Sequence, residues 1–278
     1  MDDVNRKADA IGVFDSGVGG LSVLRELLRE LPYERFVYLA DQGHAPYGER
    51  SDAHVVQRAH LIAQHLVNKH GIKALVVACN TATAAAIHLL REAHPGLPIV
   101  GIEPALKPAV SLSQTRRIGV MATRSTLQSE KFRVLAGSMR GQAEFVLQAC
   151  DGLADAIERD DAMKIGAICA HYTGALGLFG TERGQIDTLV LGCTHYPFAI
   201  RTLKALVGNT IALLEGGAPV ARQTRRLLAE QQWLSDSAPS GSTSQSRVVF
   251  GSTADPAALQ AAVGRWLERA DTVASWNI

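Results

Sequence analysis

Two of the four cysteines stand where a thiol can do chemistry. Cys79 and Cys193 each follow an apolar run directly and precede polar residues, Asn-Thr in one case and Thr-His in the other. The apolar runs predict buried strands, and the end of a parallel strand lies at the carboxyl edge of its sheet, where α/β folds bind ligands. Unpaired amides at the start of the following helix favour an anion there and lower the pKa of a thiol from about 8.5.

A buried cysteine is more often a small apolar residue without a chemical role. The shared setting of the two cysteines favours function over that alternative. Cys150 and Cys169 lack this setting, and we expect them to be structural. None of the four cysteines forms a C-x-x-C pair, so we expect neither a zinc ribbon nor a thioredoxin motif, and a reducing cytosol disfavours disulfides.

A glycine-bearing turn, DSGVGG from Asp15 onward, also follows a predicted strand and opens a predicted helix. It matches neither G-x-G-x-x-G nor a P-loop, so a bound dinucleotide is not expected. Ser16 and the exposed amides could hold a carboxylate, and Asp15 could bind an ammonium group or act as a base. The alternative for this segment is a helix cap with glycines for tight turning.

Two other side chains could contribute to such a site. Tyr47 lies in the segment Pro46-Tyr47-Gly48, which predicts a turn from which the ring could cover a site. His195 could act as an acid or base or set the charge of the nearby thiol, although a lone histidine is often structural. No lysine is singled out as a pyridoxal Schiff-base residue.

Two thiols on opposite sides of a substrate carbon suit stereochemical inversion. One thiolate removes the α-proton, and the opposite thiol delivers a proton to the other face. The carbanion must be stabilised electrostatically and water must be excluded, which closure of two domains can achieve. This chemistry needs no metal and no organic cofactor, and we expect none.

Apolar strands alternate with amphipathic helices, which is typical of parallel sheets covered on both faces. The predicted strands are 10–14, 35–39, 74–78, 99–102, 118–121, 143–147, 188–191 and 247–251. The predicted helices are 21–31, 53–69, 81–93, 125–136, 153–159 and 197–207, with a last helix after Asp255 and Pro256.

The pattern restarts in the middle of the chain. IGVFDSGVGG from Ile11 resembles IGVMATRSTL from Ile118, and IKALVVACNTATAAA from Ile72 resembles IDTLVLGCTHYPFAI from Ile186, with the two cysteines superposed. We therefore predict two similar parallel-sheet α/β domains related by an internal repeat, with the active site in the cleft between them. The expected domains are residues 1–104 with 214–278, and residues 105–213.

Composition fits this class. The chain has 278 residues, 47% hydrophobic and 20% charged, which suits a packed core and excludes wholesale disorder. The formal net charge is only +1, from 28 Lys and Arg against 27 Asp and Glu, and aromatic residues make up 5% of the chain. These values favour neither a nucleic-acid partner nor a membrane partner. The polar N-terminus resembles no signal peptide and no run could cross a bilayer, so we expect a soluble, cytoplasmic protein. A Ser-rich stretch, 235–246, predicts a surface loop to which we assign no role.

The motifs together resemble the glutamate racemases, cofactor-independent enzymes that supply D-glutamate for peptidoglycan. The matching segments are FDSGVGGLSVL at 14–24, D-x-x-x-x-P-Y-G at 41–48, ACNTAT at 78–83, GIEP at 101–104, G-V-x-A-T-x-x-T at 119–126 and LGCTHYP at 191–197. The resemblance spans most of the chain. Aspartate racemases share the fold and the cysteine pair but differ in these motifs, which favours glutamate.

The resemblance implies roles for named residues. Cys79 would deprotonate D-glutamate and Cys193 L-glutamate, with Asp15 and His195 each assisting one thiol. Substrate contacts would come from Asp15, Ser16, Tyr47, Gly48, Asn80, Thr81, Thr123, Thr126, Thr194 and His195. The family also implies two α/β domains, often in a homodimer. One departure is Leu214-Glu215-Gly216-Gly217, where members usually carry Asp-Ser, and it affects local capping more than the chemistry.

Other functions stay open on the sequence alone. An aspartate racemase would use the same mechanism on another substrate. A two-domain module that binds an amino acid without reacting would have no need of a symmetric cysteine pair. A cysteine hydrolase using Cys193 and His195 would leave Cys79 unexplained, and residues two apart on a strand-end turn need not point at each other.

Overall fold

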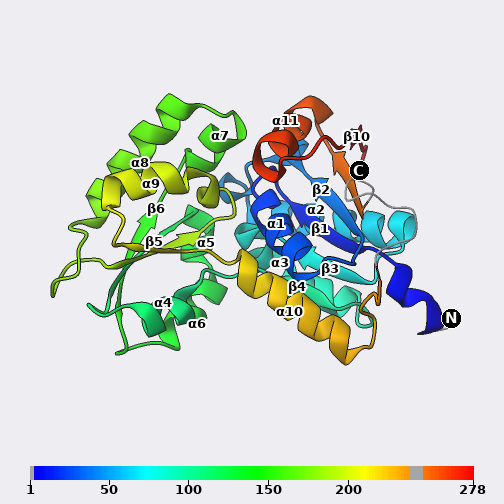
Figure 1. The fold of residues 1–278 in the computed structure, drawn as a ribbon, viewed down its shortest axis with the longest axis horizontal. Coiled ribbons are helices and arrows are strands. Elements are labelled where there is room, and N and C mark those ends of the chain that lie inside the picture. The colour runs from blue at the N-terminus through cyan, green and yellow to red at the C-terminus, as the bar shows by residue number, and fades with distance from the viewer. Residues whose placement is uncertain (1–2, 238–246) are drawn as a thin grey trace. The chain divides into compact units, whose positions relative to one another are not determined.

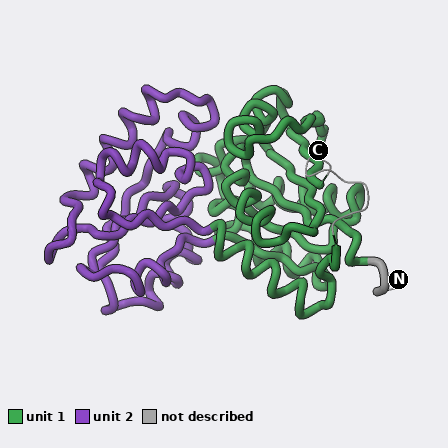
Figure 2. Tube along the Cα trace, in the orientation of Figure 1, with its two compact units in different colours: residues 1–102, 217–278 green, residues 103–216 purple. Residues whose placement is uncertain are grey.

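The computed structural model describes residues 3–237 and 247–278, which divide into two compact units (Figure 1, Figure 2). Unit 1 comprises Met1–Ile102 and Gly217–Ile278, and unit 2 comprises Glu103–Gly216. Unit 2 is therefore an insertion in a discontinuous first unit. Most of the predicted Ser-rich loop, residues 238–246, lies outside the described residues.

Unit 1 is built on a sheet of six parallel strands in the order β10-β9-β2-β1-β3-β4. The strands are β1 (Ile11–Asp15), β2 (Phe36–Ala40), β3 (Ala74–Val77), β4 (Ile99–Gly101), β9 (Val248–Ser252) and β10 (Val273–Ser275). The central strands β1, β2 and β3 are buried along their whole length. That burial is expected of parallel strands with helices on both faces.

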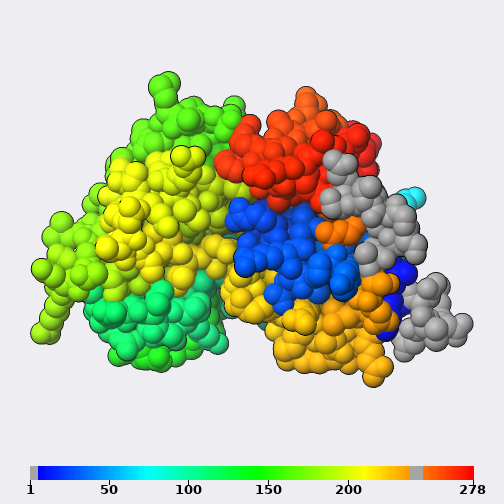
Figure 3. Space-filling view, viewed as in Figure 1, coloured from blue at the N-terminus to red at the C-terminus, as the bar shows by residue number. Residues whose placement is uncertain are grey.

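The helices of unit 1 cover both faces of its sheet. On one face, α2 (Asp52–His70) and α3 (Asn80–Ala93) share a core cluster with β1, β2 and β3. Elsewhere in the unit, α1 (Leu21–Glu30) packs against α10 (Gly217–Glu230) and α11 (Pro256–Leu267). Figure 3 shows the blue atoms of α1 between the red atoms of α11 and the orange atoms of α10. The 3-10 helices of this unit include η1 (Asp3–Ala8), η2 (Gln42–His44) and η3 (Tyr47–Glu49).

Unit 2 is built on four parallel strands in the order β6-β5-β7-β8. The strands are β5 (Arg117–Ala122), β6 (Glu144–Ala149), β7 (Thr188–Gly192) and β8 (Ala212–Leu214). One core cluster joins the sheet to α7 (Leu153–Glu158), α8 (Ala162–Leu176), η4 (Tyr196–Ala199) and α9 (Ile200–Val207). On the other face it packs against α4 (Leu106–Leu112) and α6 (Glu130–Gly137), with α5 (Arg124–Gln128) preceding α6.

The two sheets repeat the same arrangement, because β2-β1-β3-β4 corresponds to β6-β5-β7-β8. In the first sheet Ile11 pairs with Ala74, and in the second Ile118 pairs with Thr188. These are the positions that the sequence repeat aligns, so the register between the central strands is the same. The predicted internal repeat is confirmed, and β9 and β10 are additions to unit 1.

The predicted strands all form, each within two residues of its expected bounds. The predicted helix 125–136 is instead two helices, because the chain turns at Ser129, whose hydroxyl accepts from the Phe132 amide at 3.1 Å and caps α6. The expected cap of the last helix is confirmed, since Asp255 accepts from the Ala257 amide at 3.0 Å. Helices α4, α8 and α10 and strands β8 and β10 were not predicted.

In the described ranges 3–237 and 247–278, every helix is too short or too polar to traverse a bilayer.

Candidate active site

In unit 1, the first thiol lies where the order of the strands reverses. Strand β1 has β2 on one side and β3 on the other, so the carboxyl ends of β1 and β3 form the switch point at which α/β sheets bind ligands. Asp15 is the last residue of β1, and Cys79 lies two positions after the end of β3. The fold thus brings the glycine-bearing turn and the first thiol together.

Cys79 is held by the start of helix α3. Its sulfur accepts a hydrogen bond from the Ala82 amide at 3.5 Å and caps the helix. The Cys79 Sγ lies 4.0 Å from the Ser16 hydroxyl, which in turn lies 3.4 Å from Asp15 Oδ1. The same carboxylate oxygen accepts from the Gly17 amide at 2.8 Å. The Ala82 amide at the start of α3 can stabilise negative charge on the sulfur, and the Ser16 hydroxyl, which donates to Asp15, can accept the proton of the thiol.

The other site residues proposed for unit 1 flank this thiol in sequence or in the core. Asn80 and Thr81 open α3 and are buried, and the Asn80 amide nitrogen donates to the Ile102 carbonyl at 3.4 Å. Tyr47 packs in the same core cluster as Cys79 and is followed by Gly48 in η3. Burial and the neighbouring carboxylate of Asp41 raise the pKa of Tyr47 far above its usual range, so its hydroxyl stays a neutral donor.

In unit 2, the second thiol lies at the equivalent switch point. Strand β5 has β6 on one side and β7 on the other, and Cys193 directly follows β7. A Cβ added at Gly192 would lie 2.9 Å from the Cβ of Ala122 and 3.1 Å from the carbonyl oxygen of Met121. The ends of β5 and β7 therefore approach each other this closely only because position 192 is glycine.

Cys193 pairs with a histidine and, through it, with a carboxylate. Its Sγ lies 3.6 Å from Nδ1 of His195, and Nε2 of His195 lies 2.6 Å from Oε1 of Glu158 at the end of α7. Burial alone would lower the pKa of His195, but the bonds to Cys193 and Glu158 raise it well above its ordinary value. The arrangement therefore favours an imidazolium beside the Cys193 sulfur.

The three threonines proposed for unit 2 border the ends of β5 and β7. Thr123 follows β5 and caps α5, accepting from the Thr126 amide at 3.2 Å and donating to the Thr126 hydroxyl at 2.8 Å. Thr194 is buried between Cys193 and His195 in the chain. Unit 2 therefore gathers a thiol, an imidazole and three hydroxyl groups at neighbouring strand ends.

The structure differs from the sequence analysis at the second thiol. The expectation was a helix start after each cysteine, but Cys193 is followed by His195 and the 3-10 turn η4, and α9 begins only at Ile200. Cys193 and His195 do point at each other, which their spacing of two residues had left open. Local backbone geometry, which spacing alone does not specify, decides both points.

Glu158 is a functional candidate that the sequence analysis missed. It lies 37 residues before its partner His195 on a different helix, so no short motif contains both. Arg58 and the carboxylate of Asp41 were also missed as a pair, although Asp41 stands in the D-x-x-x-x-P-Y-G motif.

Within residues 3–237 and 247–278, no group of three or more His, Cys, Asp or Glu side chains is arranged to hold a metal ion.

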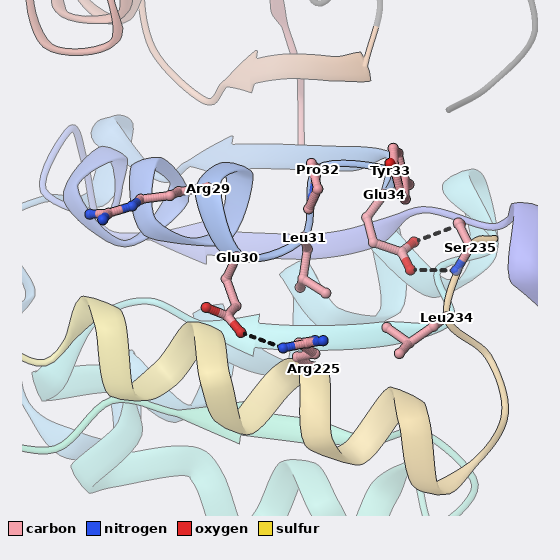
Figure 4. Close-up of a pocket in the computed structure, with 9 residues that line it drawn as sticks. All are labelled: Arg29, Glu30, Leu31, Pro32, Tyr33, Glu34, Arg225, Leu234 and Ser235. Atoms are coloured by element: carbon pink, nitrogen blue, oxygen red, sulfur yellow. Dashed lines mark hydrogen bonds and ion pairs between the residues drawn. The ribbon is translucent and has the colours of Figure 1, made fainter. Parts of the chain in front are cut away.

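A pocket of about 400 Å³ lies elsewhere in unit 1 (Figure 4). Its lining comes from the end of α1, the segment before β2, α10 and residues 234 and 235, so it lies at the amino edge of the sheet rather than the carboxyl edge. Glu34 accepts from the Ser235 amide at 2.8 Å, and Arg225 lies 3.2 Å from Glu30. No proposed site residue lines this pocket, and we place the candidate site at the strand ends.

The chain belongs to the family described as Asp/Glu/Hydantoin racemase, whose profile matches residues 11–224. A relative named glutamate racemase, from Pseudomonas entomophila (strain L48), is 42% identical over 277 residues, covering 99% of this chain and 100% of the relative. Another, from Ectopseudomonas mendocina (strain ymp), is 47% identical over 235 residues, covering 83% of this chain and 86% of the relative.

Solved structures give the same result. A glutamate racemase isoform from Bacillus anthracis superposes with a TM-score of 0.84 at 30% identity, covering 98% of each chain. Escherichia coli glutamate racemase, solved with L-glutamate and the activator UDP-MurNAc-Ala, superposes with a TM-score of 0.79 at 27% identity, covering 96% of this chain and 98% of that one. The predicted α/β class and the resemblance to glutamate racemases are confirmed.

Proposed function

We propose that this chain interconverts L-glutamate and D-glutamate, using Cys79 and Cys193 as a pair of acid–base groups. The observation that carries the proposal is one thiol at the equivalent switch point of two repeated sheets. Glutamate is favoured as substrate because relatives that match 83% and 99% of this chain are named glutamate racemases. The reaction is an isomerisation, so the enzyme is an isomerase.

The reaction moves one proton at each face of the α-carbon. The thiolate of Cys193 takes the α-proton of L-glutamate, its electron pair stays on the substrate as a carbanion, and the Cys79 thiol donates a proton to the opposite face. The product is D-glutamate, with Cys193 now a thiol and Cys79 a thiolate. The reverse reaction uses the same groups in exchanged roles, so atoms and charge balance in both directions.

The surroundings of each thiol support its role. Near Cys79, the amide at the start of α3 can stabilise negative charge on the sulfur, and the Ser16 oxygen, oriented by its bond to Asp15, can accept the proton of the neutral thiol. Near Cys193, His195 supplies positive charge and Glu158 holds the imidazole. The carbanion needs preorganised donors for its developing oxyanion charge. The proposed substrate contacts are Asp15, Ser16, Tyr47, Gly48, Asn80, Thr81, Thr123, Thr126, Thr194 and His195.

The test is circular dichroism of pure L-glutamate incubated with the protein, with no cofactor added and a chelator present. Decay of the signal to zero supports the proposal. No decay with L-glutamate, but decay with L-aspartate, would transfer the mechanism to aspartate. Two unchanged signals would reject racemisation and favour a module that only binds amino acids.

One observation favours a second candidate function. Cys193, His195 and Glu158 form a thiol–imidazole–carboxylate series, which is the arrangement of a cysteine hydrolase. That function would leave the repeated Cys79 without a role, and we rank it second. Burst release from an activated ester, abolished by Cys193→Ala and unchanged by Cys79→Ala, would favour it.

We also propose that the chain acts in the cytoplasm, supplies D-glutamate for peptidoglycan and forms a homodimer, as the family resemblance implies. Light scattering coupled to size-exclusion chromatography tests the oligomeric state. A mass of one chain across the concentrations used in the assay would reject the dimer. Growth of a strain lacking its own enzyme, rescued equally by this chain and by D-glutamate, would support the peptidoglycan role.

A further inference from the structure

Unit 1 contains a buried polar network centred on Asp41, which follows β2 directly. The Asp41 side chain is fully buried. Its Oδ2 accepts from the Tyr47 hydroxyl at 2.6 Å and from Arg58 Nε at 3.0 Å. Its Oδ1 accepts from Arg58 Nη2 at 2.9 Å and from the Thr253 hydroxyl at 2.8 Å, and lies 3.1 Å from Nδ1 of His44. Burial alone would raise the pKa of Asp41, but these bonds lower it, so the group is a carboxylate.

Arg58 supplies the positive charge of this network. It lies on α2 and is only 5% exposed. Two of its nitrogens bind both oxygens of Asp41, and its Nη1 donates to the carbonyl of Ile278 at 2.9 Å. A planar guanidinium can make this two-pronged bond and a third bond at once, whereas a lysine ammonium cannot. Arg58 therefore ties α2, the end of β2 and residue 278 into one arrangement.

Tyr47 connects this network to the first thiol. Its hydroxyl is directed at Asp41, and its ring is 1% exposed in the core cluster that also contains Cys79. Tyr47 lies in η3, which contacts α3, the helix that Cys79 caps. Negative charge at Cys79 is also among the causes that raise the pKa of Tyr47. The orientation of the Tyr47 ring, in the core cluster that also contains the thiol, is thus set by the carboxylate that Arg58 holds.

We propose that Arg58 is a positioning residue for the racemase reaction: by fixing Asp41 it fixes the Tyr47 hydroxyl and ring beside Cys79. The inference rests on the proposed function, because it assigns Arg58 a role in that reaction. A small misplacement of a group near the reacting atoms is costly for catalysis. The effect of Arg58 on the reaction must then pass through Tyr47.

A double-mutant cycle tests this route. We expect Arg58→Lys to lower kcat/KM for glutamate about tenfold when Tyr47 is present, and less than about twofold in the Tyr47→Phe background. A merely structural role would lower kcat/KM equally in both backgrounds, and that result would overturn the inference. Arg269→Lys is the matched control, because Arg269 makes the same two-pronged bond to a different carboxylate, that of Asp271. We expect it to leave kcat/KM unchanged.

A second variant keeps the test decisive if Arg58→Lys does not fold. Thr253→Val removes one neutral donor from Asp41 and retains the Arg58 pair. We expect a loss of about twofold to threefold in kcat/KM that disappears in the Tyr47→Phe background. An equal loss in both backgrounds would overturn the inference. Failure of the wild-type chain to racemise glutamate would instead reject the proposed function, so the two failures are distinguishable.

Discussion

The two thiols occupy equivalent positions but are stabilised by different groups. Cys79 caps a helix of 14 residues and lies near a serine hydroxyl, so amide dipoles favour its charge. Cys193 has no helix of that length after it and relies on the imidazole of His195. The two halves of the repeat therefore share the position of the thiol but differ in the groups that stabilise its charge. Substitutions should affect the two sides of the reaction in different ways.

Replacing either thiol with serine should make proton transfer on that side slow. Because the two enantiomers have equal free energy in solution, kcat/KM must fall equally in both directions, and we expect a loss of more than about 100-fold. The kinetic isotope effect distinguishes the sides. With Cys79→Ser, α-deuterated D-glutamate should show the large effect and α-deuterated L-glutamate a small one, and Cys193→Ser should reverse this pattern.

The control for this prediction is Cys169→Ala. Cys169 is fully buried, and burial raises its pKa to about 11, so it is a neutral thiol outside the proposed chemistry. Its replacement should leave both isotope effects as in the unmodified chain. The same isotope pattern for Cys79→Ser and Cys193→Ser would contradict assignment of one thiol to each enantiomer.

Glu158 should control the pH range of the reaction through His195. Burial alone would lower the pKa of His195, and the bonds to Cys193 and Glu158 raise it, so the imidazolium persists to a higher pH than an ordinary histidine. Glu158→Gln removes one of the raising contributions and lowers this pKa. The decline of kcat/KM on the alkaline side should then begin at lower pH, as measured in a pH–rate profile. An unchanged alkaline limb would show that Glu158 does not act through His195.

At the scale of helices and strands, the sequence predicted those elements that carry a clear pattern. The apolar runs of β1, β3, β5 and β7 identified the strands that end at the proposed site, and the repeat aligned their register. Helix α8 was missed because its sequence, AMKIGAICAHYTGAL, is largely apolar and has two glycines, so it shows little helical periodicity. Strand β8 was missed because it has only three half-buried residues.

The proposed site was predictable only in part for a similar reason. Residues that follow a strand, such as Asp15, Cys79 and Cys193, are found from the pattern that predicts the strand. Glu158 reaches His195 from another helix, and Arg58 reaches Asp41 from α2. Such contacts depend on how helices pack on a sheet, which no local spacing specifies.

The close approach of β5 and β7 should depend on Gly192. Gly192→Ala places a Cβ against the backbone of Met121 and the side chain of Ala122, and β7 must shift. We expect a loss of about 1–3 kcal/mol in the free energy of unfolding, measured by urea denaturation with far-UV circular dichroism. Gly174→Ala in α8 is the matched control, since its Cβ meets nothing within 4 Å. That control should gain about 0.5–1 kcal/mol, and an equal response of the two variants would contradict the packing explanation.

At the scale of the whole molecule, unit 1 must join the segments that precede unit 2 in the chain to those that follow it. The buried side chain of Lys73, which directly precedes β3, makes one such connection. Its ammonium lies 2.6 Å from the Glu34 carboxylate and donates to the carbonyls of Lys7 at 2.8 Å and Trp233 at 2.9 Å. Three segments far apart in the sequence are thereby fixed to one cation. Burial lowers the pKa of Lys73, and Glu34 opposes that shift.

Lys73→Met should destabilise unit 1, because it leaves the Glu34 charge buried without its cation. We expect a loss of about 3–5 kcal/mol, and a smaller loss in Lys73→Met combined with Glu34→Gln, where the buried charge is also removed. The three tryptophans, at positions 233, 266 and 276, all belong to unit 1, so their fluorescence in urea reports the unfolding of that unit. If the double variant were less stable than the single one, the uncompensated charge would not be the cause, and the lost hydrogen bonds to the chain segments would be.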